Sequence, residues 1–162
     1  CIVGHQYLHP VRSEHTHDKE FENNSTRLLA GASNGTVKNI IIVDDDRSLG
    51  ECLAKLLRSE NYETAYFPSA LTALEHLKAK PAGLLITDIQ MPEMTGLELI
   101  IRVREIKPGL PVIAMSGAWD EEMAKELFAL DVRWYLPKPL DFGYFAFIVN
   151  IALANPNLHG PP

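Results

Sequence analysis

From residue 39 onward, short apolar segments alternate with stretches of helical periodicity, and this alternation restricts the possible folds more than any other feature. The strand-like segments are Asn39–Val43, Tyr62–Phe67, Gly83–Thr87, Pro111–Met115 and Val132–Leu136. Most of them are continuously apolar, as strands covered on both faces of a sheet must be. Repeated strand–helix units build a parallel sheet with right-handed crossovers. We therefore predict an α/β fold with an open, doubly wound, five-stranded parallel sheet and helices on both faces.

Apolar residues at spacings of three and four predict helices between these strands. Two sets each share one helical face: Leu49, Cys52, Leu53, Leu56 and Leu57, and Leu71, Leu74 and Leu77. Thr95 and Glu98 have the spacing of a capping box, which predicts the start of a third helix. A fourth helix is predicted over Asp120–Leu130, and a fifth follows Lys138-Pro139 and ends near Asn155.

Residues 1–36 differ in composition from the rest of the 162-residue chain, because they hold four of its six histidines and no sustained apolar period. We predict a mobile N-terminal tail or linker over 1–36, one domain over 37–155 and a short C-terminal tail over 156–162. The histidines of the first segment have no cysteine or carboxylate cluster beside them to complete a metal site, so we expect none there.

Charge and cysteine content narrow the function classes. The chain has 15 Lys and Arg against 21 Asp and Glu, and its net charge of -6 repels phosphate backbones, so we expect no direct nucleic-acid ligand. No apolar run reaches the roughly 18 residues of a membrane span and no signal-peptide pattern is present, which predicts a cytoplasmic protein without membrane contact. Cys1 and Cys52 imply no disulfide framework, and we expect Cys52 to pack within its helix.

Carboxylates follow two predicted strands where each strand ends. Asp44, Asp45 and Asp46 come directly after the first strand, and Asp88 comes directly after the third. Because ligands of doubly wound sheets bind at the carboxyl ends of the strands, we expect these acids to lie together. At about 5 Å each pair would repel by roughly 3 kcal/mol, so the cluster needs a cation, and oxygen ligands in a hydrated site suit Mg²⁺. For Asp46 alone, capping of the next helix is the favoured interpretation.

A hydroxyl and a cation follow two more strands at the same edge. Ser116 comes after the fourth strand, and Lys138 lies just beyond the fifth. Taken singly, the serine would be a loop or cap residue and the lysine a surface charge. Together with the acids they suit a phosphoryl group on an aspartate, which needs a metal, a cation and a hydrogen-bond donor around its oxygens.

These motifs resemble the receiver domain of two-component response regulators over about residues 38–155. The resemblance rests on four segments: Val43-Asp44-Asp45, Thr87 to Gly96, Met115-Ser116-Gly117 and Leu136-Pro137-Lys138-Pro139. It implies a flavodoxin-like fold with strand order 2-1-3-4-5 and a receiver domain over residues 37–155. It also implies that the chain is no enzyme with a separate substrate, and that it catalyses only its own phosphoryl transfer and slow autodephosphorylation.

The resemblance assigns the acids and their metal. Asp88 would be the phosphoacceptor, and Asp44 and Asp45 would be the acidic pair that binds Mg²⁺ together with it. The backbone carbonyl of Gln90 would be a further ligand of the metal. The phosphoryl group would come from a histidine kinase or a histidine phosphotransfer protein.

The resemblance also assigns the residues that respond to the phosphoryl group. Ser116 would bind it and follow it inward, Lys138 would pair with it, and Tyr135 would be the aromatic switch residue that turns inward with Ser116. The Lys138-Pro139 bond is expected to be cis, which X-Pro bonds adopt at small cost. Thr95, Ser116 and Gly117 differ from the residues most common in the family, but the hydroxyl is retained, so we expect function to persist with altered kinetics.

A downstream protein is expected to bind the surface formed by the fourth helix, the fifth strand and the fifth helix. Aromatic residues lie on or beside that surface, and core packing is favoured over a partner patch for them: Trp134, Phe142, Tyr144, Phe145 and Phe147. The segment after the fifth helix is too short for an output domain. We therefore expect a stand-alone messenger, a phosphorelay intermediate or the receiver end of a hybrid kinase.

Two other function classes stay open. A pseudo-receiver would keep the fold and signal through protein contacts without phosphorylation. A phosphatase or phosphotransferase would act on small molecules through an aspartyl phosphate, but Asp88-Ile89-Gln90 lacks the second acid, two residues on, that would serve as general acid. The intact set of charged residues at the sheet edge favours the phosphorylated receiver over both.

Overall fold

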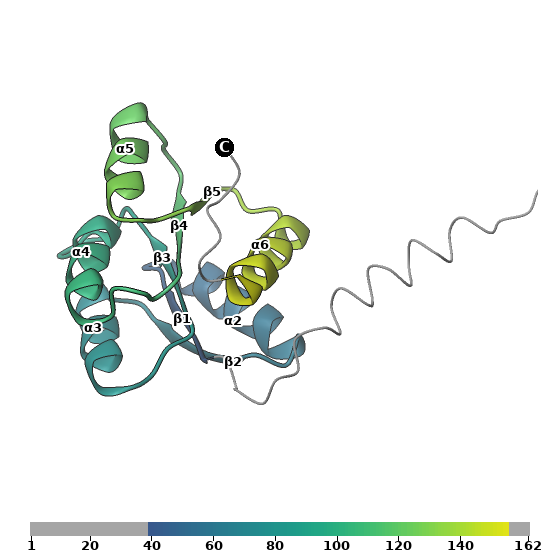
Figure 1. The fold of residues 1–162 in the computed structure, drawn as a ribbon. Coiled ribbons are helices and arrows are strands. Elements are labelled where there is room, and N and C mark those ends of the chain that lie inside the picture. The colour runs from purple at the N-terminus through teal and green to yellow at the C-terminus, as the bar shows by residue number, and fades with distance from the viewer. Residues whose placement is uncertain (1–38, 156–162) are drawn as a thin grey trace, which may run out of the picture. The chain divides into compact units, whose positions relative to one another are not determined.

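A five-stranded parallel sheet forms the centre of the computed structural model, which describes residues 39–155 (Figure 1). Its strands are β1 (Asn39–Val43), β2 (Glu63–Phe67), β3 (Leu84–Asp88), β4 (Val112–Ser116) and β5 (Trp134–Pro137). The strand order is β2-β1-β3-β4-β5, and every neighbouring pair is parallel. The predicted doubly wound sheet of order 2-1-3-4-5 is confirmed. The predicted tails, 1–36 and 156–162, lie outside the described residues.

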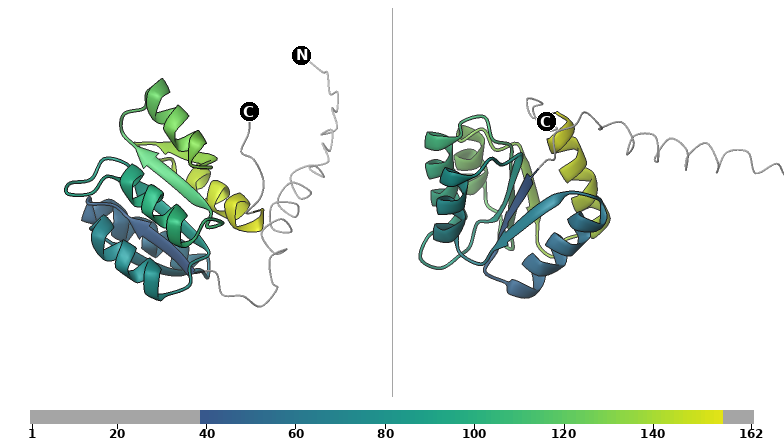
Figure 2. Two further views of the ribbon diagram at one scale, coloured as in Figure 1. Left: turned by 60° about the vertical axis from the view of Figure 1, so that its left-hand side comes forward. Right: turned by 90° about the horizontal axis from the view of Figure 1, so that it is seen from below.

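Each of the five predicted helices is present, and they cover both faces of the sheet. They are α2 (Arg47–Ser59), α3 (Ala70–Ala79), α4 (Gly96–Ile106), α5 (Glu121–Ala129) and α6 (Phe142–Ala154). Helices α2 and α6 lie on one face, and α3, α4 and α5 lie on the other (Figures 1 and 2). This arrangement leaves the carboxyl ends of the strands open at one edge of the sheet.

The hydrophobic core has two halves, one on each side of the sheet. Strand β1 shows the division, because Ile40 and Ile42 pack toward α2 and α6 whereas Ile41 and Val43 pack toward α3 and α4. This alternation follows from the period of two in an extended strand. All four side chains are fully buried. Continuously apolar strands are therefore required, as the sequence indicated.

Strands β2 and β5 begin later than predicted, because each preceding helix ends in a Schellman motif. Asn61 and Asp131 have positive φ angles of 65° and 57°. The N–H groups of the next residues, Tyr62 and Val132, donate back to carbonyls in the last helical turn at 3.1 and 2.9 Å. These N–H groups satisfy carbonyls at a helix end. Tyr62 and Val132, which we expected to open strands, are capping residues.

Strands β3 and β4 are each displaced by one residue toward the C-terminus relative to the prediction. Asp88 pairs with Met115 in the sheet, and Ser116 pairs with Pro137. Both side chains that we expected just after a strand therefore belong to the last residue of one. Their backbone positions are fixed by the sheet ladder.

Two residues predicted to pack against the sheet are exposed instead. Cys52 in α2 is exposed, and Leu71 in α3 is 46% exposed. The buried face of α2 includes Ala54, and that of α3 includes Ala70 and Ala73. Alanine allows a helix to approach the sheet closely, so the buried stripe is rotated away from the positions that large apolar residues alone indicated.

Candidate functional site

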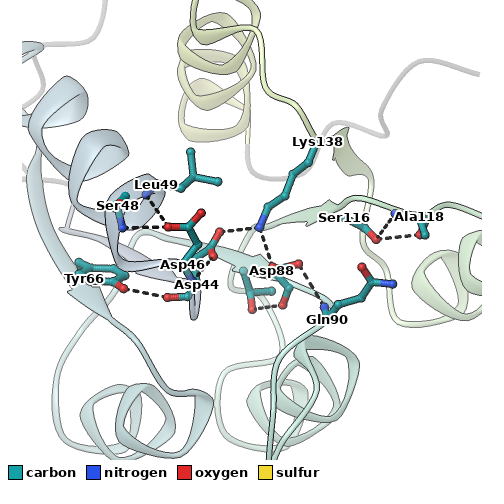
Figure 3. A network of polar contacts seen from close by, with 11 residues as sticks. Asp44, Asp46, Ser48, Leu49, Tyr66, Asp88, Gln90, Ser116, Ala118 and Lys138 are labelled. Carbon is teal, nitrogen blue, oxygen red and sulfur yellow. Dashed lines mark hydrogen bonds and ion pairs between the residues drawn. The ribbon is translucent and has the colours of Figure 1, made fainter.

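One lysine bridges two buried carboxylates at the open edge of the sheet (Figure 3). Asp44 directly follows β1, Asp88 ends β3 and Lys138 directly follows β5. The Lys138 Nζ lies 2.9 Å from Asp44 Oδ2 and 2.6 Å from Asp88 Oδ2. Asp44 is fully buried and Asp88 is 5% exposed. The structure thus brings together, from three strands, side chains that lie up to 94 residues apart in the chain.

Asp45 completes an acidic cluster with these two residues. One carboxylate oxygen from each of Asp44, Asp45 and Asp88 lies within 4.8 Å of the others, and Asp45 is exposed to solvent. Three negative charges with one lysine leave two charges uncompensated, so the donor set suits a divalent cation with oxygen preference, such as Mg²⁺. The acids that would hold it are Asp44, Asp45 and Asp88.

Backbone amides orient the two buried carboxylates. The Asp46 N–H donates to Asp44 Oδ1 at 2.9 Å, and the Gln90 N–H donates to Asp88 Oδ1 at 3.1 Å. Asp46 itself caps α2, because its Oδ1 accepts from the N–H groups of Ser48 and Leu49 at 2.9 and 3.1 Å. The capping interpretation of Asp46 is confirmed.

Burial is the largest influence on the pKa values of Asp44 and Lys138. Burial raises the pKa of Asp44 above its usual range, and the nearby Lys138 ammonium offsets this only in part. Burial works against the charged form of Lys138 as well, but hydrogen bonds to Asp44 and Asp88 and the charges of both acids raise the pKa of the lysine. The lysine therefore stays charged, while the charged form of buried Asp44 is disfavoured, and a second cation beside it would stabilise that form.

A glycine fixes the loop that follows Asp88. A Cβ added at Gly96 would lie 2.0 Å from the backbone oxygen of Asp88, so no larger residue fits there. The Gly96 N–H donates to the Ile89 carbonyl at 2.9 Å. Just before it, Thr95 and Glu98 form the predicted capping box at the start of α4. The loop thereby closes tightly against the aspartate.

Sequence reasoning missed two uncharged residues that support Asp44. The Tyr66 hydroxyl donates to the Asp44 backbone carbonyl at 2.9 Å. Its ring occupies the space beside Gly50, where an added Cβ would lie 2.1 Å from the Tyr66 Cε2 atom. The available signal was a glycine within an otherwise helical pattern, which often marks a close approach.

Ser116 lies at the same edge, but its hydroxyl is bonded away from Asp88. It donates to the Ala118 carbonyl at 2.7 Å and accepts from the Ala118 N–H at 3.2 Å. Figure 3 shows this pair to one side of the contacts between Lys138 and the acids. Tyr135 is 57% exposed, so its ring faces outward. The Lys138-Pro139 bond is cis, as predicted.

Comparison with known proteins identifies the family. The model of the family described as the response regulator receiver domain matches residues 40–148. The chain belongs to this family. The receiver domain is 34% identical over 128 residues to the transcriptional regulatory protein ZraR of Klebsiella oxytoca, a match that covers 79% of this chain and 29% of ZraR. It is 38% identical over 81 residues to the response regulator receiver protein CpdR of Brucella abortus, covering 50% of this chain and 68% of CpdR.

Solved receiver structures share the fold. A receiver domain protein from Methanospirillum hungatei matches with a TM-score of 0.72 and 25% identity, over 75% of this chain and 97% of that one. A receiver protein from Pseudomonas putida matches with a TM-score of 0.68 and 31% identity, over 72% of this chain and 98% of that one. This receiver domain thus matches nearly the whole of those solved chains, but less than a third of ZraR.

Several aromatic side chains expected in the core of the receiver domain are exposed. Phe142, Tyr144 and Phe147 of α6 are 46%, 51% and 58% exposed, whereas Phe145 is fully buried. The helix buries one stripe, yet its sequence is apolar almost all round, so aromatic residues remain outside that stripe. For these three residues the prediction of core packing was wrong. Within residues 39–155, no helix has both the length and the apolar character to cross a membrane.

Proposed function

We propose that this receiver domain takes a phosphoryl group from a phosphohistidine of a histidine kinase or histidine phosphotransfer protein onto Asp88. Mg²⁺ would be held by Asp44, Asp45, Asp88 and the backbone carbonyl of Gln90. The observation that carries the proposal is the position of the Asp88 carboxylate, 2.6 Å from Lys138 and within 4.8 Å of both other acids. Carboxylates crowded in this way at an open sheet edge suit a bound cation and a transferred phosphate.

In the proposed step, a carboxylate oxygen of Asp88 forms a bond to phosphorus while the phosphorus–nitrogen bond of the phosphohistidine breaks. The imidazole keeps the electron pair of that bond. Lys138, already hydrogen-bonded to the Asp88 carboxylate, would stay beside the new phosphoryl oxygens. Bound Mg²⁺ would supply further charge neutralisation for those oxygens. The chain would then hydrolyse its aspartyl phosphate slowly and convert no other substrate.

Ser116 and Tyr135 would report the transfer to the rest of the domain. The acceptor oxygens of the phosphoryl group would draw the Ser116 hydroxyl away from Ala118, and Tyr135 would turn into the space that is vacated. Such a local change biases a surface with two arrangements. Gln90 and Ala118 occupy positions that would tune the lifetime of the phosphate.

The surface that would pass on the signal is the α5–β5–α6 surface, defined by its exposed aromatics: Phe128, Tyr135, Phe142, Tyr144 and Phe147. Exposed aromatics of this number suit a protein partner. Relatives are named as transcriptional regulatory proteins, and we propose that this chain acts in the cytoplasm on a downstream protein. Its net charge of -6 disfavours direct contact with nucleic acid, and we propose no contact with a membrane.

The test is labelling with acetyl phosphate in the presence of Mg²⁺, read by intact mass. The parent chain should gain one phosphoryl group, and Asp88→Asn should gain none. Asp131→Asn is the matched control, because it makes the same chemical change at an exposed aspartate whose positive φ asparagine tolerates. It should label like the parent.

Three results would contradict this proposal. Equal labelling of the parent and Asp88→Asn would place the acceptor elsewhere. A parent that neither labels nor binds Mg²⁺ in calorimetry would favour the pseudo-receiver. Turnover of a small phosphoester by the parent alone would favour the phosphatase.

A further inference from the structure

Within residues 39–155, Trp119 carries a buried hydrogen-bond donor that has no acceptor. It lies in the connection between β4 and α5 and packs, partly buried, against the core beneath α3, α4 and α5. Its indole Nε1 is buried, and within residues 39–155 it has no hydrogen-bond partner. Buried N–H groups nearly always have an acceptor, and an unpaired one destabilises the conformation that contains it. The unpaired N–H of Trp119 therefore destabilises the observed conformation.

The same indole contacts the outward-facing ring of Tyr135. The ring centroids lie 5.1 Å apart with an interplanar angle of 49°. Tilted aromatic pairs at this separation attract each other beyond the area that they bury. Tyr135 is 57% exposed, so its ring makes this contact while it lies in the outward position. The indole thus favours the outward position of the tyrosine.

The backbone next to Trp119 is held by Ser116. The Ser116 hydroxyl makes two hydrogen bonds to Ala118, one to its carbonyl and one from its N–H. Movement of this hydroxyl toward Asp88 must break both bonds. The backbone of Ala118, just before Trp119, is then no longer held by Ser116, and the Ala118 carbonyl loses a donor.

We propose that Trp119 is a positioning residue that couples Ser116 to Tyr135. The inference rests on the proposed function and adds to it the element through which the two residues communicate. In the resting conformation the indole ring holds Tyr135 outward while its N–H stays unpaired. When Ser116 leaves Ala118, Trp119 shifts, releases Tyr135 and gains an acceptor for its N–H. The ring contact therefore favours the resting state, whereas the unpaired N–H favours the activated state.

Two substitutions of Trp119 separate the effect of its ring from the effect of its N–H. Beryllofluoride with Mg²⁺ serves as the probe of the activated state. Trp119→Phe keeps an aromatic ring but removes the N–H, so the resting state loses its disadvantage. The affinity for beryllofluoride, measured by calorimetry on the full chain, should fall by about fivefold or more. Trp119→Leu also removes the ring contact, so its affinity should be higher than that of Trp119→Phe. Trp134→Phe, the same change at a tryptophan of β5, should leave the affinity of the parent unchanged.

Tryptophan fluorescence distinguishes a coupling role of Trp119 from a purely structural one, because a structural role predicts no change of its signal on activation. In the Trp134→Phe background Trp119 is the only tryptophan, and its emission and acrylamide quenching should change when beryllofluoride binds. The Asp88→Asn version should show no change. Binding to the parent with an unchanged Trp119 signal, or equal affinities of Trp119→Phe and Trp119→Leu, would overturn the coupling and leave the proposed function intact. Failure of the parent to bind beryllofluoride would overturn both.

Discussion

Gly50 and Tyr66 show how uncharged residues can hold a charged site in place. The tyrosine hydroxyl fixes the backbone carbonyl of Asp44, and its ring needs the space that a Cβ on Gly50 would fill. Neither residue belongs to the charged cluster. The position of Asp44 at the end of β1 nevertheless depends on both, because its carbonyl is tied to β2 through the tyrosine.

The contact between Gly50 and Tyr66 predicts that the effect of Gly50→Ala on stability changes sign when the Tyr66 ring is removed. Gly50→Ala should lower the free energy of unfolding by about 1–3 kcal/mol, because the new methyl group overlaps the Tyr66 ring. In a Tyr66→Ala background the space is free, and the same change should raise the free energy of unfolding by up to about 1 kcal/mol through helix propensity. Chemical denaturation of the parent, the two single variants and the double variant measures both values. An equal cost of Gly50→Ala in the two backgrounds would contradict the contact.

The charged residues could be predicted from the sequence, whereas their supports could not. Asp44, Asp88 and Lys138 directly follow or end apolar strands, and parallel topology places strand ends at one edge. The contact of Tyr66 with Asp44 depends on the register of β2 against β1 and on the rotation of α2. The unpaired indole of Trp119 likewise depends on a loop conformation. The local sequence pattern specifies neither the register and rotation of neighbouring elements nor the conformation of a loop.

At the scale of elements, Arg104 ties the end of α4 to the end of α5. Its Nε donates to the Leu130 carbonyl at 2.7 Å, and its Nη1 donates to the Leu110 carbonyl at 2.6 Å. Leu130 is the C-cap residue of α5, and Leu110 lies just before β4. One guanidinium therefore satisfies carbonyls from two connections that the helices leave unpaired.

Loss of this arginine should loosen α5 more than the rest of the domain. Arg104→Met keeps the apolar stem but removes the donors, and it should lower the free energy of unfolding by about 2–3 kcal/mol. Amide exchange in the last turn of α5 should rise. Arg102→Met is the matched control, because Arg102 is exposed on the same helix, and it should change stability by less than about 0.5 kcal/mol. Similar losses for both variants would argue against the bridge.

The type and order of the elements were predictable, but several of their ends were not. Apolar runs and helical spacing gave five strand–helix units in the right sequence. Helices α2 and α5 end in Schellman motifs that need Asn61 and Asp131 in the left-handed region, and neither residue is the glycine that usually marks such an end. Tyr62 and Val132 were therefore assigned to strands, which their β-branched and aromatic character favours.

At the scale of the whole molecule, the acidic cluster connects stability to pH and to metal. The folded chain keeps a proton on Asp44 at a pH at which the unfolded chain has lost it, because the pKa of Asp44 is raised from 3.8. The stability that this residue contributes is therefore greatest when the carboxyl is protonated. It falls as the pH rises from 3.8 through the raised pKa.

Comparison with Asp44→Asn isolates this titration from that of other acids. With metal removed by a chelator, the melting temperature of the parent should fall relative to that of Asp44→Asn as the pH rises from about 4 to about 7. Excess Mg²⁺ should offset the fall for the parent only, since binding to the folded state adds stability by mass action. Calorimetric scans at several pH values measure both effects. Parallel curves for the two chains, with and without Mg²⁺, would refute the prediction.

The sharing of one lysine between two buried acids has a consequence for protein engineering. A library of this chain that is screened for heat resistance alone, without metal, should enrich neutral replacements of Asp44, because they remove an uncompensated charge. Under the proposed function, such variants would be more heat-resistant but unable to take up the phosphoryl group, a trade-off between stability and activity that is common at functional sites. Screening that also demands phosphoryl uptake would keep the aspartate and direct improvement to places such as the cap residues of the helices.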